Sequence, residues 1–579
     1  MKKIMLGNEA VARGLYEAGV SFVSSYPGTP STEITEFAAK YDEIYAEWAP
    51  NEKVALEAAL GASVGGARSF CAMKHVGLNV AADPLFITAY TGVGGGFVIG
   101  VADDPGMHSS QNEQDIRHYA EAAKLPMAEP ADSAECKEFV RLCYEYSEKF
   151  DTPFILRLTT RVSHSSNPVE TLERSELPLK EYVKDAAKHV MMPANARRRH
   201  IVVEKRLADL EEFAYSCPFN KIEKGGSLGI ITAGNCYNYA KEVFGDSASY
   251  LKLGLVYPLS EKLIREFAES VEQIIVIEEL DGFIERFCRS MGLKVTGKDV
   301  LPLCGEYSQS LLREKLLGEE PQNTALGDDI PARPPVLCPG CPHRGVFYVL
   351  KKMGVTVSGD IGCYTLGAVP PLAAMDSTYC MGASISALHG FNKVRGDEDR
   401  SVAVIGDSTF MHSGMTGLVN IVYNGGKSTV IILDNRITGM TGHQQNPLTG
   451  LTLKNTPAPY ICLEDICAGL GVAREHIRVV DPAKLKELEQ VIGEELSADC
   501  PSVVICRRPC ALLKGVERHP ALRVNTEKCR GCTSCMKIGC PCISMVRGED
   551  GKKKAAVDPL MCVGCGLCKE LCAFGAFED

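Results

Sequence analysis

The spacing of the last cysteines constrains this chain more than any other feature. Nine of its 25 cysteines lie between residues 529 and 579, and eight of them form two runs built on three-residue steps. The runs are Cys529, Cys532, Cys535 and Cys540, and then Cys562, Cys565, Cys568 and Cys572. Such steps let three thiolates from one loop face a single metal centre, and a cytosolic chain would not hold so many thiols as disulfides. Because a segment as short as 520–579 cannot rely on an apolar core, we expect bound metal to supply part of its folding energy.

This cysteine-rich segment resembles the bacterial two-cluster ferredoxins, in which the last cysteine of each run crosses to the other cluster. The resemblance implies one [4Fe–4S] cluster on Cys529, Cys532, Cys535 and Cys572, and a second on Cys540, Cys562, Cys565 and Cys568. The segment departs from the pattern twice, because four residues rather than three precede Cys540 and Ala573 stands where proline is usual. Cys542 is an alternative ligand to Cys540. Zinc and a disulfide knot stay open, although no histidine stands beside these cysteines, which disfavours a mixed zinc site.

The composition narrows the class of protein. The chain has 579 residues, 45% of them apolar and 23% charged, which is ordinary for a globular protein of about three to five domains. Its 62 basic and 73 acidic residues give a net charge of −11, which argues against a nucleic-acid partner. The longest uncharged stretch, 84–102, is too rich in glycine to span a bilayer, and no signal peptide is visible, so we expect a cytoplasmic protein without a membrane partner.

Apolar strand-like runs alternate with helical patterns along most of the chain, which predicts α/β domains with parallel sheets. The clearest predicted strands are 228–232, 274–277, 401–405 and 428–433. Changes in composition predict domains at 1–190, 225–320, 336–516 and 520–579. A charged, solvated linker helix is expected within 191–224, and three prolines predict another linker at 328–336.

Two polar residues follow neighbouring predicted strands of the third domain. Asp407 closely follows one strand and Asn435 closely follows the next, so a right-handed βαβ unit would bring both to the same edge of the sheet. Two oxygen ligands make an incomplete Mg²⁺ site, which substrate phosphates and water typically finish. The stretch from Gly406, Asp407 and Ser408 to Asn435 resembles the thiamine-diphosphate motif. That resemblance implies that Asp407, Asn435 and the carbonyl of Ile437 hold the Mg²⁺ that anchors the diphosphate. Without the resemblance, Asp407 and Asn435 would be ordinary turn residues that end strands.

Four further segments extend the resemblance over the whole chain, namely 26–31, 48–53, 338–343 and 359–363. With the two regions above, they make the chain similar to the 2-oxoacid:ferredoxin oxidoreductase family, in particular to its indolepyruvate-oxidising α subunits. The implied fold class is α/β, with doubly wound thiamine-diphosphate-binding domains of pyrimidine type at 1–190 and of diphosphate type at 336–516. A transketolase-C-terminal-like α/β domain at 225–320 and a C-terminal two-[4Fe–4S] ferredoxin-like α+β domain complete it.

The reaction implied by the resemblance is oxidative decarboxylation of an aryl 2-oxoacid with coenzyme A, which gives an acyl-CoA, CO2 and reduced ferredoxin. Its cofactors are thiamine diphosphate, Mg²⁺ and two [4Fe–4S] clusters. Relatives also carry a smaller γ-type domain that has no counterpart here, so we expect a separate β subunit and an α2β2 assembly. The sequence does not choose among indolepyruvate, phenylpyruvate and hydroxyphenylpyruvate. An aldehyde-releasing decarboxylase and a non-enzymatic electron-transfer subunit are the alternative functions.

Candidate catalytic residues lie in the first domain. Thiamine chemistry needs a carboxyl group on the aminopyrimidine ring, and Glu52 corresponds to it by resemblance, although alone it would be a first-turn glutamate favoured by the helix dipole. The resemblance makes Thr29 a candidate for the substrate carboxylate and His75 one for the cofactor. Arg117 could bind a carboxylate through two nitrogens. Each has a structural alternative: the Thr29 hydroxyl could bond within its own turn, His75 could be a packed core residue, and Arg117 could form a surface ion pair.

Four cysteines outside the tail are candidate ligands of a third cluster. Relatives that bind a cluster near thiamine use a Cys-x-x-Cys pair, a Gly-Cys and a late Pro-Cys, which correspond here to Cys338, Cys341, Cys363 and Cys510. Buried inert thiols and a redox-active Cys-x-x-Cys pair are the alternatives. Iron analysis separates them, because two [4Fe–4S] clusters need eight iron atoms for each chain and three need twelve.

Overall fold

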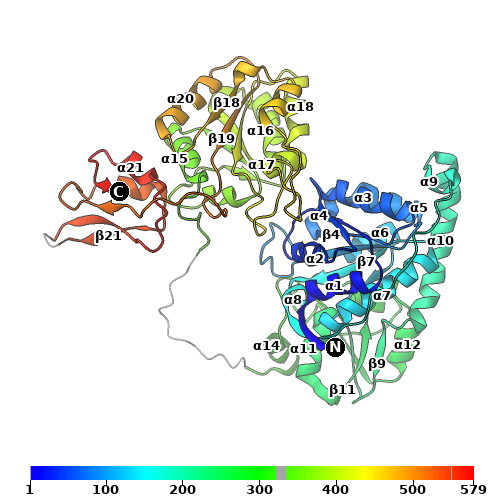
Figure 1. Cartoon of the computed structure of the whole chain (residues 1–579). Helices are drawn as coiled ribbons and strands as arrows, with labels where there is room; N and C mark the ends of the chain where they lie inside the picture. Colours follow the sequence, from blue (N-terminus) through cyan, green and yellow to red (C-terminus); the bar gives the residue numbers. More distant parts are fainter. Residues whose placement is uncertain (1, 321–333, 549–550) are drawn as a thin grey trace. The chain divides into compact units, whose positions relative to one another are not determined.

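A computed structural model of the chain describes residues 2–320, 334–548 and 551–579 (Figure 1). They fall into two compact units, Met1–Asp328 and Asp329–Asp579. Each unit contains a predominantly parallel sheet flanked by helices, as the alternation of strand-like and helical patterns predicts. The predicted linker at 328–336 lies mostly outside the described residues. Among the helices described, none is long and apolar enough to cross a membrane.

The larger sheet of the first unit has seven strands in the order β12-β6-β7-β5-β4-β2-β3, parallel except at β12. They are β2 (Phe22–Ser25), β3 (Tyr45–Trp48), β4 (Ser69–Lys74), β5 (Phe97–Asp103), β6 (Met127–Ala128), β7 (Phe154–Thr159) and β12 (Leu255–Tyr257). The central strands β4, β5 and β7 are buried along their whole length. Burial on both faces explains why these strands are mostly apolar rather than alternating.

Helices follow most of these strands. They are α1 (Gly7–Glu17), α2 (Thr32–Ala38), α3 (Glu52–Val64), α4 (His75–Val80), α5 (Ala82–Thr91), α6 (Arg117–Ala123), α7 (Ser133–Phe150) and α8 (Thr160–His164). Helix α3 begins after Asn51, whose side chain accepts a hydrogen bond from the Val54 amide at 2.9 Å. This cap fixes the start of α3 and so the position of Glu52 in its first turn. A short antiparallel pair, β1 (Lys2–Leu6) and β8 (Ser166–Glu170), joins the two ends of this region.

The predicted linker at 191–224 is mainly one long helix, α10 (Pro193–Ser216), preceded by α9 (Ala186–His189). The expectation of a solvated helix is only partly right, because one face of α10 is buried. Arg206 lies on that face, 4% exposed, and donates to the carbonyl oxygens of Asp151, at 2.7 Å, and Ala89. The guanidinium therefore binds helix-end carbonyls of the first domain instead of water.

The segment 225–320 forms most of a second sheet in the order β13-β10-β11-β9, in which only β9 is antiparallel. Strand β9 comes from the range 191–224, which the sequence predicted to be a linker. Its strands are β9 (Lys221–Glu223), β10 (Leu228–Ala233), β11 (Ala248–Leu253) and β13 (Gln273–Ile277), and its helices are α11 (Gly234–Phe244), α12 (Glu261–Glu269), α13 (Phe283–Ser290) and α14 (Gln309–Leu312), the last continued by a π-helical turn, η2 (Arg313–Leu317). The predicted strands at 228–232 and 274–277 are thus confirmed. Strand β12 from the same segment pairs with β6 and extends the first sheet.

The sheet of the second unit is wholly parallel, in the order β15-β14-β16-β17-β19-β18. Its strands are β14 (Thr356–Gly359), β15 (Ser377–Thr378), β16 (Ser401–Gly406), β17 (Thr429–Asp434), β18 (Ile477–Val480) and β19 (Ser502–Arg507). The βαβ unit predicted around Asp407 is present: after β16 the chain runs through α17 (Asp407–Thr409), a π-helical turn and α18 (Met415–Tyr423) to β17.

Alternate residues of these strands enter two different cores. Val404 and Leu433 belong to one core, with α15 (His343–Met353) and α20 (Leu485–Leu496). Ile405 and Ile432 belong to the other, with α16 (Ala383–Arg395), α18 and α19 (Leu463–Gly469). Apolar residues on both faces of each strand are what a doubly wound sheet requires.

The cysteine-rich end of the chain has little regular structure. Its elements are the antiparallel pairs β20 (Arg523–Val524) with β23 (Phe577–Glu578) and β21 (Ile543–Arg547) with β22 (Lys553–Val557), and the short helices η7 (Ser534–Ile538) and α21 (Leu567–Leu571). Apolar side chains of this segment, such as Ile538 and Phe577, share a core with Phe347 of α15. The segment therefore shares apolar packing with the sheet of its own unit, a contribution that the sequence did not predict beside the expected metal.

Candidate active site

The strands β14, β16 and β17 end side by side, and each end carries an acidic or amide side chain. After β16, the buried carboxylate of Asp407 accepts hydrogen bonds from the amides of Ser408, at 2.8 Å, and Arg436, at 3.0 Å. The second bond joins the loop that follows β17 to the end of β16. The predicted meeting of Asp407 with the Asn435 loop is therefore present in the structure.

The electrostatics of this edge favour a cation. Asp407 is 2% exposed, and burial first, then the neighbouring carboxylate of Asp434, raises its pKa to about 8. Such a carboxyl group is held neutral at neutral pH unless a positive charge stabilises its anion. A divalent ion supplies that charge and also inverts the effect of burial on the pKa. The oxygen atoms here fit Mg²⁺, which prefers carboxylate and carbonyl ligands.

Asn435 is positioned by its neighbours on both sides. Its Oδ1 accepts from the amide of Ile437 at 3.2 Å, and its Nδ2 lies 3.4 Å from Nε2 of His343. Burial lowers the pKa of His343 to about 4, so the imidazole is neutral at neutral pH and can accept a hydrogen bond from the amide. Gly406, the residue before Asp407, has no room for a side chain, because an added Cβ would lie 2.7 Å from Cε1 of Tyr364.

Asp360, at the end of β14, is a site residue that we did not single out in the sequence. Its carboxylate is fully buried and accepts three backbone hydrogen bonds, from Ile361 at 2.8 Å, Gly382 at 2.9 Å and Ser384 at 2.9 Å. These bonds hold the turn that begins α16 against the end of β14. The signal was available, because Gly359-Asp360 repeats the Gly-Asp pair that follows β16.

The four candidate ligands of a third cluster gather at the same edge of the sheet. The Cys510 amide donates to the carbonyl of Asn435 at 3.0 Å, and the Cys341 amide donates to the carbonyl of Cys338 at 3.1 Å. Burial, with a smaller contribution from the other thiols of the group, raises the pKa of Cys341 to about 12 and that of Cys363 to about 11. The structure thus brings together thiols that are far apart in the sequence.

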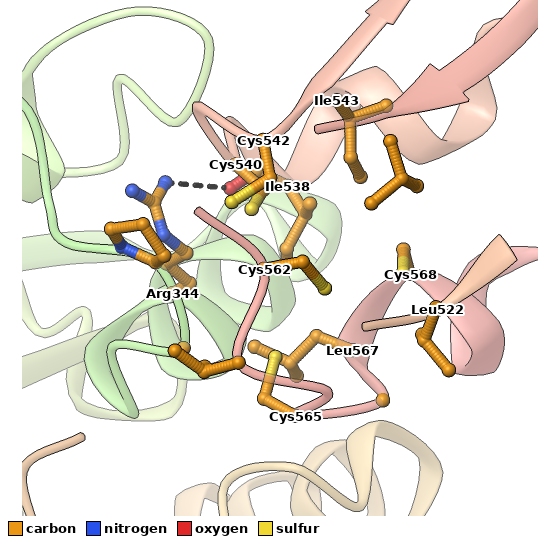
Figure 2. Close-up of a pocket in the computed structure, with 15 residues that line it drawn as sticks. Arg344, Leu522, Ile538, Cys540, Cys542, Ile543, Cys562, Cys565, Leu567 and Cys568 are labelled. Atoms are coloured by element: carbon orange, nitrogen blue, oxygen red, sulfur yellow. Dashed lines mark hydrogen bonds between the residues drawn. The ribbon is translucent and has the colours of Figure 1, made fainter. Parts of the chain in front are cut away.

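The two runs of tail cysteines line two separate cavities. One is lined by Cys529, Cys532, Cys535 and Cys572, and the other by Cys540, Cys542, Cys562, Cys565 and Cys568. The last cysteine of each run thus lies with the other run, which is the crossed arrangement of two-cluster ferredoxins. Figure 2 shows the second cavity, with Cys540 and Cys542 on one side and Cys562, Cys565 and Cys568 around it. Cys542 stays an alternative to Cys540, because both line the cavity.

Glu52, in the first unit, is 4% exposed and lies against α4. A Cβ added at Gly77 would come within 2.6 Å of its Oε1 and its Cγ, so only glycine leaves space for this carboxyl group. Glu52 also raises the pKa of Cys71, after the larger effect of burial, which places its charge near β4. A buried carboxyl group at the start of a helix is suited to hold or give a proton.

Thr29 and His75 lie around one loop, which follows β5. The carbonyl oxygen of partly buried Thr29 accepts from the Ser109 hydroxyl at 3.4 Å, and Nε2 of buried His75 lies 3.3 Å from the Asn112 carbonyl. Burial, and then the charge of Lys74, lowers the pKa of His75, which favours a neutral ring. Lys74 donates to the Ser109 carbonyl at 2.7 Å, and burial lowers its pKa to about 8. This lysine was missed as a candidate, although it precedes His75.

Arg117 binds a carboxylate through two nitrogens, as considered from the sequence, but this carboxylate belongs to the buried side chain of Asp115. It is 1% exposed, its Nε and Nη2 bind Asp115 at 2.9 and 2.6 Å, and its Nη1 binds Glu278 at 2.5 Å. Nη2 also donates to the carbonyls of Glu279 and Asp281, both at 3.0 Å. The expected surface pair is therefore wrong, and a bidentate bond to a substrate would require displacing these partners.

Comparison with known proteins finds one matching family model in each unit. Residues 13–210 match a family described as pyruvate flavodoxin/ferredoxin oxidoreductase, thiamine diphosphate-binding, and residues 360–506 match the thiamine pyrophosphate enzyme C-terminal binding domain. The indolepyruvate oxidoreductase subunit IorA of Archaeoglobus fulgidus is 41% identical over 99% of this chain and 96% of its own. Its counterparts in Pyrococcus horikoshii and Methanothermobacter thermautotrophicus are 39% and 40% identical, each over 100% of this chain and 97% of theirs. The chain belongs to the indolepyruvate oxidoreductase subunit IorA family.

Membership of the IorA family makes the chain an enzyme subunit, as expected from the sequence. The two matched ranges contain the polar residues described above: Glu52 and Thr29 lie in the first, and Asp407 and Asn435 lie in the second. The tail cysteines and Cys510 lie outside both matched ranges. Their grouping rests on the thiol-lined cavities and on the contacts at the β17 edge.

Proposed function

We propose that this IorA-family chain is the α subunit of an oxidoreductase that decarboxylates aryl 2-oxoacids, such as indolepyruvate, with coenzyme A. The products are the aryl acyl-CoA and CO2, and the two electrons released pass singly to ferredoxin. The names of its relatives support the 2-oxoacid substrate. The proposal is carried mainly by one observation: a single compact unit contains both the buried Asp407 edge and two thiol-lined cavities.

Thiamine diphosphate fits the residues present in the second unit. Asp407, Asn435 and the carbonyl of Ile437 would hold Mg²⁺, and Gly406 and Ser408 would lie against the diphosphate. The fit rests on the raised pKa of Asp407, because a buried carboxylate without a cation is costly. When bound, thiamine diphosphate supplies the carbanion that attacks the keto carbon and takes up the electrons left by CO2.

Glu52 would hold the proton that thiamine chemistry requires. Its place in a dry first turn of α3, against Gly77, suits a carboxyl group that exchanges a proton with a bound base. Thr29 and His75 are proposed to contact the substrate carboxylate and the cofactor. Lys74, which is buried near both, would attract an anionic substrate to this part of the first unit.

The tail is proposed to hold two [4Fe–4S] clusters in a ferredoxin-like domain and to carry electrons out. One cluster would bind Cys529, Cys532, Cys535 and Cys572, and the other Cys540, Cys562, Cys565 and Cys568. Iron–sulfur clusters suit this role because each changes its charge by one electron at a time. The gathering of Cys338, Cys341, Cys363 and Cys510 supports a third cluster. The domain limits at 1–190, 225–320, 336–516 and 520–579 are part of the same proposal.

We further propose that a smaller β subunit of γ type completes the enzyme as an α2β2 assembly. The subunit names of the relatives support a partner chain. The test is anaerobic co-expression with such a β subunit, followed by a panel of 2-oxoacids assayed by viologen reduction with and without coenzyme A. We expect acyl-CoA from arylpyruvates. Release of an aldehyde, independent of coenzyme A, would instead support a simple decarboxylase.

A matched variant tests the thiamine half of the proposal. Glu52→Gln keeps the size of the side chain but removes its proton exchange, so viologen reduction should fall by at least a hundredfold. The visible absorption of the iron–sulfur clusters should stay that of the wild type, because Glu52 lies in the first unit and the tail cysteines lie in the second. Unchanged activity in Glu52→Gln would support a chain that only transfers electrons.

A further inference from the structure

Arg344, on α15, is a buried cation that binds main-chain carbonyls. It is 2% exposed, and its Nη1 donates to the carbonyl oxygens of Ile538, at 3.2 Å, and Gly539, at 2.5 Å. Its Nε donates to the carbonyl of Cys338 at 3.2 Å, and its Nη2 donates to that of Leu337. Figure 2 shows the guanidinium pointing toward the loop of Ile538 and Cys540.

The side chains whose negative charge would most favour the Arg344 cation are thiols. Those that favour its cationic form are, in decreasing order of effect, Cys540, Cys341, Cys338 and Cys565. Within residues 334–548 and 551–579 no ion pair joins Arg344 to a carboxylate. In contrast, buried Arg117 and Arg157 each contact two carboxylates.

This environment would be costly for a guanidinium unless the thiols carry negative charge. Arg344 is 2% exposed and arginine is not deprotonated in proteins, so a full positive charge is buried here. Four thiolates on an iron–sulfur core leave a net negative charge, and reduction adds one more. The charge of Arg344 would thus be balanced by clusters, because no acidic side chain that the structure describes pairs with it.

The loop that carries Cys338 and Cys341 packs directly on the tail. Gly340 in this loop has φ of +71°, and a Cβ added there would lie 2.4 Å from Cγ2 of Val563 and 3.6 Å from Cβ of Cys565. Pro339, Gly340 and Arg344 consequently line the same cavity as the second run of cysteines. Arg344 therefore lines this cavity and also binds the carbonyl of Cys338 in the loop before α15.

We propose that Arg344 is a positioning residue that raises the reduction potential of the cluster bound by Cys540, Cys562, Cys565 and Cys568. The step that it assists is the transfer of one electron onto this cluster, in which the 2-oxoacid of the proposed reaction is oxidised, iron is reduced, and no bond at the cluster forms or breaks. A fixed positive charge in a dry site stabilises the added negative charge strongly. The inference rests on the proposed function, because it requires iron at these thiols.

The test is an anaerobic redox titration of the full-length, iron-loaded chain, followed by electron paramagnetic resonance. Arg344→Met removes the charge and keeps much of the volume, whereas Arg344→Lys keeps the charge. We expect the neutral variant to favour the oxidised cluster at least tenfold, which is a shift of about −59 mV for a one-electron couple. The lysine variant should stay close to the wild-type potential. Hydrogen bonding alone predicts that both variants shift together.

Arg508 provides a matched control near the same cavity. Its charge also acts on Cys565, but its Nη1 pairs with Asp481 at 2.8 Å and its side chain is 31% exposed. Arg508→Met should therefore shift the potential less than Arg344→Met, because a carboxylate and water already offset this charge.

Each outcome decides the matter. A shift confined to Arg344→Met supports the proposal, and equal potentials in the wild type, Arg344→Met and Arg508→Met overturn it. If Arg344→Met does not take up iron, Arg344→Gln takes its place, since its amide can still donate to two carbonyls. If neither neutral variant takes up iron while Arg344→Lys does, the residue serves assembly and the proposal is overturned. Wild-type protein without iron would overturn the proposed function itself.

Discussion

Replacing Asp407 by asparagine should stabilise the metal-free protein while abolishing its response to Mg²⁺. The unfolded carboxyl group ionises near 3.8, whereas burial keeps the folded one protonated until about pH 8. Below 3.8 both states are protonated, and stability is then lost as pH rises toward the folded pKa, because only the unfolded state gives up its proton. At 1.36 kcal/mol per pH unit, the loss at pH 7 is about 4 kcal/mol.

Asparagine removes this loss, but one of the hydrogen bonds from the Ser408 and Arg436 amides is weakened, which costs about 1–2 kcal/mol. The net gain is about 2–3 kcal/mol, or about 4–12 °C in the unfolding temperature for a unit of this size. The assay is anaerobic thermal unfolding of wild type and Asp407→Asn at pH 6, 7 and 8 in magnesium-free buffer.

The difference between the two proteins should grow from pH 6 to pH 8, and only the wild type should gain stability when Mg²⁺ and thiamine diphosphate are added. Asp499→Asn is the control, because that side chain is 89% exposed in the same unit and its loss should change neither curve. The reasoning is refuted if Asp407→Asn is no more stable than the wild type at pH 8, or if the difference does not depend on pH.

Three other predictions test separate features. Gly77→Ala should displace Glu52 and lower viologen reduction at least tenfold, whereas Gly61→Ala, with nothing within 4 Å of its added Cβ, should leave the activity unchanged. Cys510→Ala should reduce the iron content from twelve atoms to eight if the third cluster forms, and an unchanged content of eight would exclude that cluster. Arg117→Met should destabilise the first unit by about 3–5 kcal/mol in urea unfolding, since it leaves buried carboxylates without their cation; a loss below 1 kcal/mol would contradict this role.

The sequence predicted what depends on local pattern. Apolar runs on both faces of a strand indicated the parallel sheets, and the succession of strand, helix and strand around Asp407 sufficed to place it near the Asn435 loop. Short steps between tail cysteines similarly predicted that three thiols of one run share a cavity, whereas the crossing of Cys540 and Cys572 to the other run came from the resemblance to two-cluster ferredoxins. The roles assigned to Glu52, Thr29 and His75 came from resemblance and stay predictions.

What the sequence could not provide depends on contacts between distant segments. Arg117 is held by Glu278, more than 160 residues later, and no periodicity reveals such a partner. Arg206 looked like one charge among many in a linker, yet it is buried against the end of α5. Arg344 follows a cysteine motif, but its importance depends on carbonyls of the tail loop.

The apolar core that the tail shares with α15 couples the integrity of the tail to the stability of the rest of the second unit. Leu522, Ile543 and Phe577 are buried with Val346 and Phe347, so the last sixty or so residues are not an appendage on a tether. A truncation that removed them would expose apolar side chains of this core and make the protein prone to aggregation. Damage that unravels this end should therefore reach the Asp407 edge as well, and oxygen sensitivity becomes a property of the entire second unit.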